Sequence, residues 1–206
     1  MNIAVFGATG GTGREFTQQA LDAGHEIRAL VRTPSKLNLT HDALTVLEGD
    51  VLDADKVAET VSGAGAVVIS LGNTANNPEF IVTNGTKTIL NAMQAAGVTR
   101  VVAVSSIGVG DSKNNVPFAF RMMMKAIPGM KHAMEDKEQQ EAILMASDFD
   151  WIIVRPGGLV DEPAKGNYKH GLKVGAGRIS RADVGAFVLK QLTDDTYLKK
   201  AVSISG

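Results

Sequence analysis

Hydrophobic and polar positions along the chain follow two alternating periods. Short, nearly continuous apolar runs, such as Ala66 to Ser70, are typical of strands that a parallel sheet buries on both faces. Longer stretches lie between them, in which apolar residues recur at helical spacing, the first from Arg14 to Ala23. Strands therefore alternate with helices throughout, which predicts an α/β fold built on one doubly wound parallel sheet.

The strands are expected where apolar runs lie between turn residues. The segment 108–117 is rich in Gly, Asn, Asp and Ser and is expected to be a loop. The expected strands are 2–6, 26–32, 43–47, 66–70, 100–105, 151–154 and 201–204, with a further short strand at 172–174.

Several expected helices carry recognisable end signals. Asp53 is a suitable N-cap because its side chain can accept hydrogen bonds from the first N–H groups of a helix. Ser180 and Asp183 have the spacing of a capping box. The expected helices are 14–23, 54–61, 79–96 closed by Gly97, 118–146 broken at Pro128-Gly129, and one that follows Ser180 through Leu192.

Length and charge limit the classes of protein that need to be considered. At 206 residues, of which 44% are hydrophobic, the chain is expected to form one domain over 1–206. Its net charge of −1 predicts no strong attraction to nucleic acid or to an anionic membrane. No apolar run approaches the ~20 residues of a membrane span. The first strand begins at residue 2, so we expect no signal peptide and a cytoplasmic protein.

Candidate metal ligands are sparse. The chain contains no cysteine, which excludes disulfides, thiol nucleophiles and thiolate metal sites. The remaining candidates show neither H-x-x-x-H nor HExxH spacing, so we expect no metal site; they are the four histidines His25, His41, His132 and His170.

A glycine-rich loop joins the first expected strand to the first helix. GATGGTG begins at Gly7 with no intervening linker, and its spacing is G-x-x-G-x-x-G rather than G-x-G-x-x-G. Glycines allow a sharp turn and close approach of the backbone to a pyrophosphate, and the helix start offers free N–H groups and a positive dipole end. We predict a dinucleotide site that includes Gly7, Thr9, Gly10, Gly11, Thr12 and Gly13.

The end of the second strand indicates which dinucleotide is bound. Arg32 stands about 20 residues beyond the glycines, where an acidic residue would bind the adenosine ribose of NAD. A guanidinium can instead pair with a 2′-phosphate, which a carboxylate would repel. Ser35 and Lys36 supply further donors, so the sequence favours NADPH. The alternative is that Arg32 is only a surface arginine at a strand end.

The next strand ends add further contacts to the same crevice. Asp50 can accept a hydrogen bond from the adenine amino group while Val51 packs against its face, although Asp50 could equally serve only to organise the turn. Leu71 and Gly72 follow the fourth strand, where Gly72 would let the chain pass close to the ribose and diphosphate. Ligands of open α/β sheets bind where such strand ends converge.

Together, several stretches resemble the atypical short-chain dehydrogenase/reductase superfamily, and most closely its biliverdin-IXβ reductase and flavin reductase group. They are GATGGTG, the VR of strand two, GDV, SLG, AAGVTRVVAVSS, IIVRPGGLVDEP and ISRADVG. The resemblance implies a Rossmann sheet of order 3-2-1-4-5-6, with NADPH across the ends of strands one, two, four and five. It also implies a substrate side built mainly from 108–147 and 155–180. The segment expected beside the nicotinamide is Pro156, Gly157, Gly158 and Leu159.

The chain departs from the catalytic pattern of the wider superfamily. That pattern pairs a serine with Tyr-x-x-x-Lys, but neither Tyr168 nor Tyr197 is followed four residues later by lysine. Lys137 stands where the motif lysine is expected, and the residue four before it is Ala133. Gly158 occupies the position of a histidine found in the biliverdin and flavin group. A tyrosine-driven carbonyl reduction is therefore not expected.

Flavin reduction remains compatible with this sequence, because a flavin needs stacking and orientation more than a protein acid. Ser105 and Ser106 end strand five; Ser106 aligns with a serine near the hydride-transfer site of the resembling group, although both could simply end the strand. Lys137 could bind a ribose hydroxyl or an acidic substrate group, or be an exposed helix lysine. We predict an NADPH-dependent reductase of a flavin or similar planar acceptor, monomeric or weakly dimeric; the alternative is a non-catalytic, NmrA-like NADP sensor.

An apolar segment rich in methionine surrounds Pro128-Gly129. Methionine adapts to varied shapes, so the segment could cover the nicotinamide as a lid for a planar ligand. The alternative interpretation is that it belongs to the core or to a subunit interface. Its residues are Phe118, Phe120, Met122, Met123, Met124, Ile127, Met130 and Met134.

Overall fold

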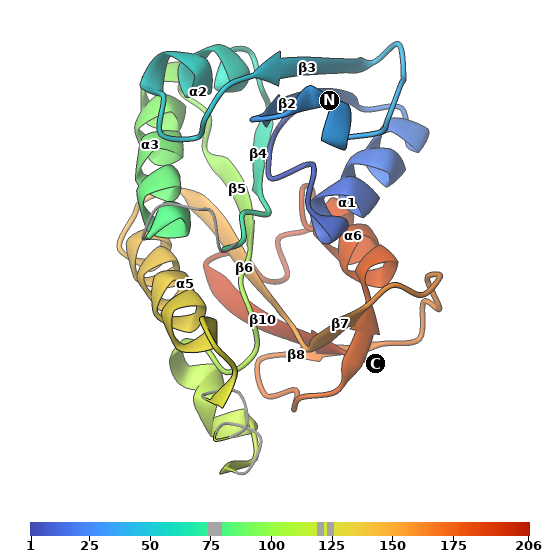
Figure 1. Ribbon diagram of the computed structural model, residues 1–206, viewed down its shortest axis with the longest axis vertical. Helices are drawn as coiled ribbons and strands as arrows, with labels where there is room; N and C mark the ends of the chain where they lie inside the picture. Colours follow the sequence, from blue (N-terminus) through green and yellow to red (C-terminus); the bar gives the residue numbers. More distant parts are fainter. Residues whose placement is uncertain (74–79, 119–121, 123–125) are drawn as a thin grey trace.

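A computed structural model describes residues 1–73, 80–118, 122 and 126–206 of the protein. At its centre lies an eight-stranded sheet of order β3-β2-β1-β4-β5-β6-β10-β8, and β7 and β9 pair separately (Figure 1). The strands are β1 (Asn2–Phe6), β2 (Glu26–Val31), β3 (Leu44–Glu48), β4 (Ala66–Ile69), β5 (Arg100–Val104), β6 (Asp150–Pro156), β7 (Gly158–Val160), β8 (Lys169–Gly171), β9 (Arg178–Ser180) and β10 (Lys200–Ser205).

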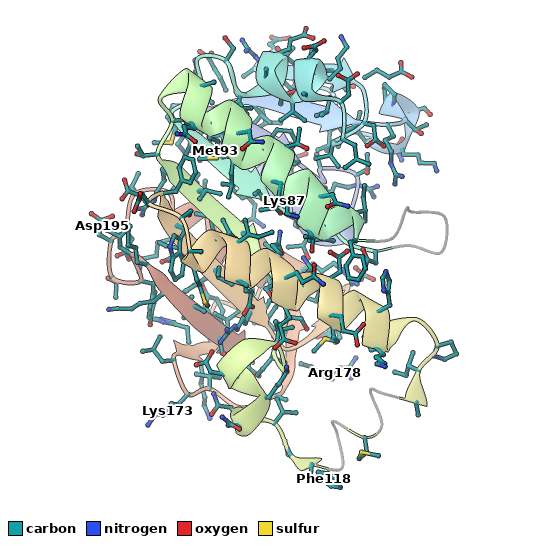
Figure 2. The ribbon with its side chains drawn as sticks, turned by 90° about the vertical axis from the view of Figure 1, so that its left-hand side faces the viewer. Lys87, Met93, Phe118, Lys173, Arg178 and Asp195 are labelled. Atoms are coloured by element: carbon teal, nitrogen blue, oxygen red, sulfur yellow. The ribbon has the colours of Figure 1, made fainter. Side chains whose placement is uncertain are left out.

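Helices cover both faces of the sheet. The α-helices are α1 (Gly11–Asp22), α2 (Ala54–Val61), α3 (Ile81–Ala96), α5 (Met130–Met145) and α6 (Arg181–Lys190), and two 3-10 helices are η1 (Pro34–Lys36) and η2 (Gly110–Asn115). One face carries α1 and α6, and the other carries α2, α3 and α5 (Figure 1). Figure 2 looks onto the second layer, where α3 and α5 pack side by side. Among the described residues, no helix combines the length and apolar character needed to span a membrane.

The hydrophobic core has two parts, one on each side of the sheet. All four residues of β4 are fully buried, as the continuous apolar run predicts for a central parallel strand. Phe16 of α1 and Phe187 of α6 pack in the first part, and Ile89 of α3 and Leu144 of α5 in the second. The α/β prediction is confirmed by this arrangement of layers.

The order of the first six strands is that of a Rossmann sheet, as the resemblance implies. β1 pairs in parallel with both β2 and β4, so its carboxyl end lies where the chain switches direction across the sheet. β10 extends the sheet in parallel beyond β6, and β8 adds an antiparallel edge to β10. The sheet is therefore mostly, rather than wholly, parallel.

The predicted helix ends agree well with the structure. The side chain of Asp53 accepts from the main-chain N–H groups of Asp55 and Lys56, and so caps α2. Ser180 caps α6 by accepting from the N–H of Asp183 at 2.9 Å. Gly97 closes α3 with a φ of 69°, a left-handed conformation that glycine adopts without strain.

Three local expectations were wrong. The strand expected at 172–174 is a turn, in which Leu172 is 50% exposed, and Lys169–Gly171 forms β8 instead. The reason is that this edge strand forms by pairing with β10 and not by burying apolar side chains. The helix expected from Arg14 begins at Gly11, because the loop runs directly into the helix and its last three residues form the first helical turn. The loop over 108–117 contains η2. Part of the helix expected over 118–146 lies outside the described residues, and α5 begins directly after Gly129.

Candidate cofactor and active site

The glycine loop between β1 and α1 has no room for side chains. Gly7 has a φ of 93°, and a Cβ there would collide with the carbonyl of Ser70 at the end of β4. A Cβ on Gly13 would collide with the carbonyl of Gly7, across the turn that the N–H of Gly10 closes by donating to the same oxygen at 3.0 Å. Glycine is therefore required for the loop to pack against β4 and turn into α1, whose first residues, Gly11 and Thr12, line the adjoining cavity.

A cavity of about 750 Å³ opens at the carboxyl ends of β1, β2, β4, β5 and β6. Most residues that the sequence assigned to the site line this cavity, although they come from segments far apart in the chain. They are Gly7, Thr9, Gly10, Gly11, Thr12, Arg32, Asp50, Val51, Leu71, Gly72, Ser105, Ser106, Lys137, Pro156, Gly157 and Leu159.

Four of the assigned residues do not line the cavity. Gly13 lies beneath the loop and supports it, as its contact with Gly7 shows. Ser35 and Lys36 are exposed on η1, just beyond the end of β2. Gly158 has entered β7, where its N–H donates to the carbonyl of Gly177 at 2.7 Å.

The end of the cavity next to β2 contains the expected cation. Arg32 follows β2 and lines the cavity beside Asp50 and Val51. Asp50 also organises its own turn, because its side chain accepts from the N–H of Leu52 at 2.9 Å. Arg14 of α1 donates to the carbonyl of Lys36 at 3.0 Å and so ties η1 to the glycine loop.

Two polar side chains in the cavity wall lack partners among the described residues. The Oγ of Ser105 and both amide atoms of Asn73 are buried without a hydrogen bond. Buried polar groups in folded proteins are nearly always paired, so such groups in a cavity wall indicate a place for a polar ligand. Together with the glycine cradle, they fit a dinucleotide. Asn73 was missed in the sequence, although it directly follows the SLG segment.

Lys137 is held by the ends of two neighbouring strands. Its Nζ donates to the carbonyl of Leu71 at 2.7 Å and to that of Val104 at 2.5 Å, following β4 and ending β5 respectively. The side chain is partly buried, which excludes the alternative that Lys137 is a freely exposed helix lysine. Burial lowers the pKa of Lys137 to about 8, and the carboxylates of Asp136 and Glu141 offset part of that effect.

A buried polar contact between α3 and α5 positions Lys137. The carboxylate of Asp136 accepts from the main-chain N–H groups of Val82 at 3.0 Å and Thr83 at 2.7 Å, in the first turn of α3. Gln140, one turn further along α5, donates to the hydroxyl of Thr86 at 3.0 Å. Asp136 thus caps α3 from a different helix, a role for which the sequence carried no local signal.

A second buried network supports the segment that follows β6. Arg155 is 1% exposed and donates to both carboxylate oxygens of Glu141, at 2.9 Å from Nε and 2.6 Å from Nη2. Its Nη1 donates to Asp111 of η2 at 2.6 Å. The guanidinium therefore joins β6, α5 and η2 directly before Pro156 and Gly157, which line the cavity.

The apolar wall of the cavity comes from α5. Met130, Ala133 and Met134 line it, so two of the methionines predicted to lie over the nicotinamide do face this space. Phe118 lies at the far end of the molecule and is 73% exposed (Figure 2). Phe120, Met123 and Met124, which belong to the same prediction, lie outside the described residues.

Arg181, the first residue of α6, was also missed by sequence reasoning. Its side chain lies over Gly11, and a Cβ on that glycine would be 2.5 Å from the Cδ of Arg181. The two residues are 170 positions apart, so only the packing of α6 against α1 brings them together.

Comparisons with known proteins agree with this geometry. A sequence profile of the family described as NAD(P)H-binding matches residues 7–195. The chain is 29% identical to the reductase pytE of Aspergillus terreus, over 98% of this chain and 97% of that protein. It is 25% identical to ChuY, described as an anaerobillin reductase from Escherichia coli O157:H7, with a TM-score of 0.84 over 100% of this chain and 97% of the other. A Veillonella parvula short-chain dehydrogenase/reductase crystallised with NADP shares the fold, with a TM-score of 0.81 at 20% identity over 100% of this chain and 94% of that one.

Proposed function

Because the chain belongs to the NAD(P)H-binding family, we propose that it is an oxidoreductase that uses NADPH to reduce a flavin or a similar planar, conjugated acceptor. The observation that carries the proposal is a single cavity in which a glycine cradle, a cation at the end of β2 and unpartnered polar groups lie together. The reductase names of pytE and ChuY support an oxidoreductase of this kind.

Main-chain groups and Arg32 account for binding of the cofactor in this proposal. The N–H groups at the start of α1 receive the diphosphate, where the helix dipole favours an anion. Arg32 pairs with the 2′-phosphate, assisted by Ser35 and Lys36 from η1. Asp50 and Val51, which line the cavity beside Arg32, hold the adenine.

The nicotinamide end lies against the ends of β4, β5 and β6. The N–H of Gly157 already donates to the carbonyl of Ile204 at 2.9 Å, so the carbonyl oxygens of Pro156 and Gly157 are the main-chain groups that accept from the carboxamide N–H. Arg155 keeps that segment in place through Glu141. The unpartnered Oγ of Ser105 and the amide of Asn73 gain hydrogen bonds to the bound ribose or carboxamide.

Lys137 and Ser106 complete the proposed reaction site. Two of the three N–H groups of Lys137 donate to main-chain carbonyls. The distance from its Nζ to the Oε1 of Gln140 is long, at 3.4 Å, so the third N–H group can donate to a ribose hydroxyl or to an acidic group of the acceptor. Ser106, whose Oγ donates to the carbonyl of Ile107 at 3.2 Å, lines the same cavity and in this proposal orients the acceptor or a water molecule.

The proposed chemistry needs no tyrosine. Tyr168 and Tyr197 pack around Phe187 of α6, with ring centroids 6.0 Å and 6.1 Å from it, and neither lines the cavity. Bound NADPH supplies the hydride, and water can supply the proton that accompanies reduction of a flavin. The protein therefore contributes a surface that stacks and orients the acceptor, with Met130 and Met134 as its adaptable part. The described residues of segments 108–147 and 155–180 surround that surface in this proposal.

Steady-state oxidation of NADPH tests the proposal. The assay compares FMN, riboflavin, small quinones and anaerobillin, the last because ChuY is named for it. We expect turnover with at least one planar acceptor, with NADPH preferred over NADH. A protein that binds NADPH but turns over none of these acceptors would contradict the proposed enzyme. Equal affinity for oxidised and reduced cofactor, together with capture of a specific partner protein, would then favour the NmrA-like sensor. The observation that supports this alternative is that neither Tyr168 nor Tyr197 lines the cavity.

A further inference from the structure

The start of α6 places a guanidinium directly over the glycine loop. Ser180 caps the helix, and Arg181 follows with its side chain lying across Gly11. A Cβ on Gly11 would be 2.5 Å from the Cδ and 2.6 Å from the Nε of Arg181, and both residues line the cavity. The cation thus stands where the first turn of α1 presents its N–H groups.

The present partner of Arg181 is an exposed acid. Its Nη1 donates to the Oδ1 of Asp161 at 2.7 Å, and the side chain of Asp161 is 87% exposed, whereas that of Arg181 is 27% exposed. An ion pair with one partner almost wholly in water contributes little to stability. A phosphate offers the same guanidinium two acceptor oxygens and a stronger charge-assisted contact.

We propose that Arg181 is a diphosphate-binding residue that exchanges Asp161 for a phosphate oxygen when a dinucleotide enters the cavity. This inference rests on the use of a dinucleotide in the proposed function, but not on the identity of the acceptor. It concerns the diphosphate shared by NADPH, NADH and ADP-ribose, whereas the role of Arg32 concerns the 2′-phosphate of NADPH alone. Asp161 therefore acts as a competitor that weakens binding.

The ion pair is not needed to hold the segment that follows β7. Asp183 of α6 accepts from the main-chain N–H of Lys165 at 3.0 Å and from that of Gly166 at 2.9 Å. Asp183 is itself buried and accepts from the hydroxyl of Ser180 at 2.7 Å. Because these bonds already fix the segment to α6, Asp161 can release Arg181 without moving the backbone around it.

Another basic residue of the loop region is directed elsewhere. Arg14, on the first turns of α1, donates to the carbonyls of Thr9 at 3.4 Å and Lys36 at 3.0 Å, and so points along η1. Arg181 is the cation whose stem crosses Gly11. Because of this placement, we assign the contact with the diphosphate to Arg181 and not to Arg14.

Calorimetric titration of the full chain with NADPH, NADH and ADP-ribose tests the exchange. We expect Arg181→Gln to weaken all three ligands by roughly tenfold, the usual worth of one charge-assisted hydrogen bond. Asp161→Asn should tighten all three by about threefold, because it removes the competitor. In the Arg181→Gln background, Asp161→Asn should have no effect, and Arg181→Lys should recover part of the affinity.

Glu162→Gln is the matched control. Glu162 is the neighbouring acid, its change removes the same charge, and its own partner is Lys165 at 2.7 Å, so we expect no change in affinity. Thermal unfolding verifies that each variant is folded. Weaker binding by Asp161→Asn, or unchanged binding by Arg181→Gln, would overturn the inference. No acceptor is present in these titrations, so a failed turnover assay would refute the proposed reduction without touching this result.

Discussion

The two halves of the cavity are built in different ways. The half formed by the glycine loop uses main-chain groups from contiguous residues, and Gly7 and Gly13 sit where any Cβ would collide with a carbonyl. The half formed by the ends of β4, β5 and β6 uses side chains from distant segments, among them Asn73, Ser105 and Lys137. The backbone shape of the first half is fixed by these glycines, with Arg32 and Arg181 as its added cations, whereas the second half is defined mainly by side chains.

The difference concerns how polar groups are satisfied. In the glycine half, the turn closes through main-chain hydrogen bonds such as that from Gly10 to Gly7. In the other half, the side-chain polar atoms of Asn73 and Ser105 are buried without hydrogen-bond partners in the part of the chain that the structure describes, while Lys137 and Arg155 are bound by several acceptors. A constant ligand suits the first arrangement and a variable one suits the second, because side chains can change without disturbing a main-chain cradle.

The largest expected effect comes from breaking the buried network behind the second half. Arg155→Met leaves the carboxylate of Glu141 buried without its cation, and we expect a loss of about 3–5 kcal/mol in the free energy of unfolding. Urea unfolding measures the loss. Adding Glu141→Met to Arg155→Met should restore much of the stability, since the pair is then replaced by apolar groups. A double variant as unstable as the single one would contradict this account.

We predict that the choice between NADPH and NADH in the first half depends on Arg32. Arg32→Asp should weaken NADPH by about 100-fold, because a charge-assisted contact is lost and a carboxylate now faces the 2′-phosphate. NADH, which lacks that phosphate, should change by no more than about threefold. Titration of both cofactors measures the ratio. Equal losses for NADPH and NADH would exclude a role in phosphate pairing.

Removing an unpartnered hydroxyl should affect ligand binding but not the stability of the free protein. Ser105→Ala removes no hydrogen bond among the described residues, so we expect an unchanged Tm, together with NADPH binding weakened by about 1 kcal/mol. Thermal melts with and without cofactor measure both quantities. Ser112→Ala is the matched control, because its Oγ donates to the carbonyl of Val109 at 2.6 Å and its loss should lower stability. A drop in Tm for free Ser105→Ala would show that its hydroxyl is satisfied within the protein.

The second half also predicts a pH dependence of stability. The pKa of Lys137 is lowered to about 8 in the folded protein, below its ordinary value of 10.5. Between these values the unfolded chain binds a proton that the folded chain has released, so Lys137 makes stability rise with pH from about 8 to 10.5. Lys137→Met should remove that rise, whereas Lys131→Met, an exposed change on the same helix, should keep it. Urea unfolding at several pH values compares the slopes.

Much of the fold was predictable because its signals are local. Alternating apolar runs and helical stretches predicted the main strands, and Asp53 and Ser180 cap the helices that their positions indicated. β8 escaped prediction because Lys169–Gly171 has no apolar pattern and is held by main-chain bonds to β10 at the edge of the sheet. Pairing at an edge depends on the available neighbour more than on the residues themselves.

The candidate site divides in the same way. By itself, the sequence determined the glycine loop and the position of Arg32 at the end of β2, since each follows from residues adjacent in the chain. Only the tertiary structure decided that Lys137 bridges two carbonyls 66 and 33 residues away, and that Arg181 lies over Gly11. Spacing along the chain specifies a turn or a cap, but contacts between remote side chains exist only once helices have packed against the sheet.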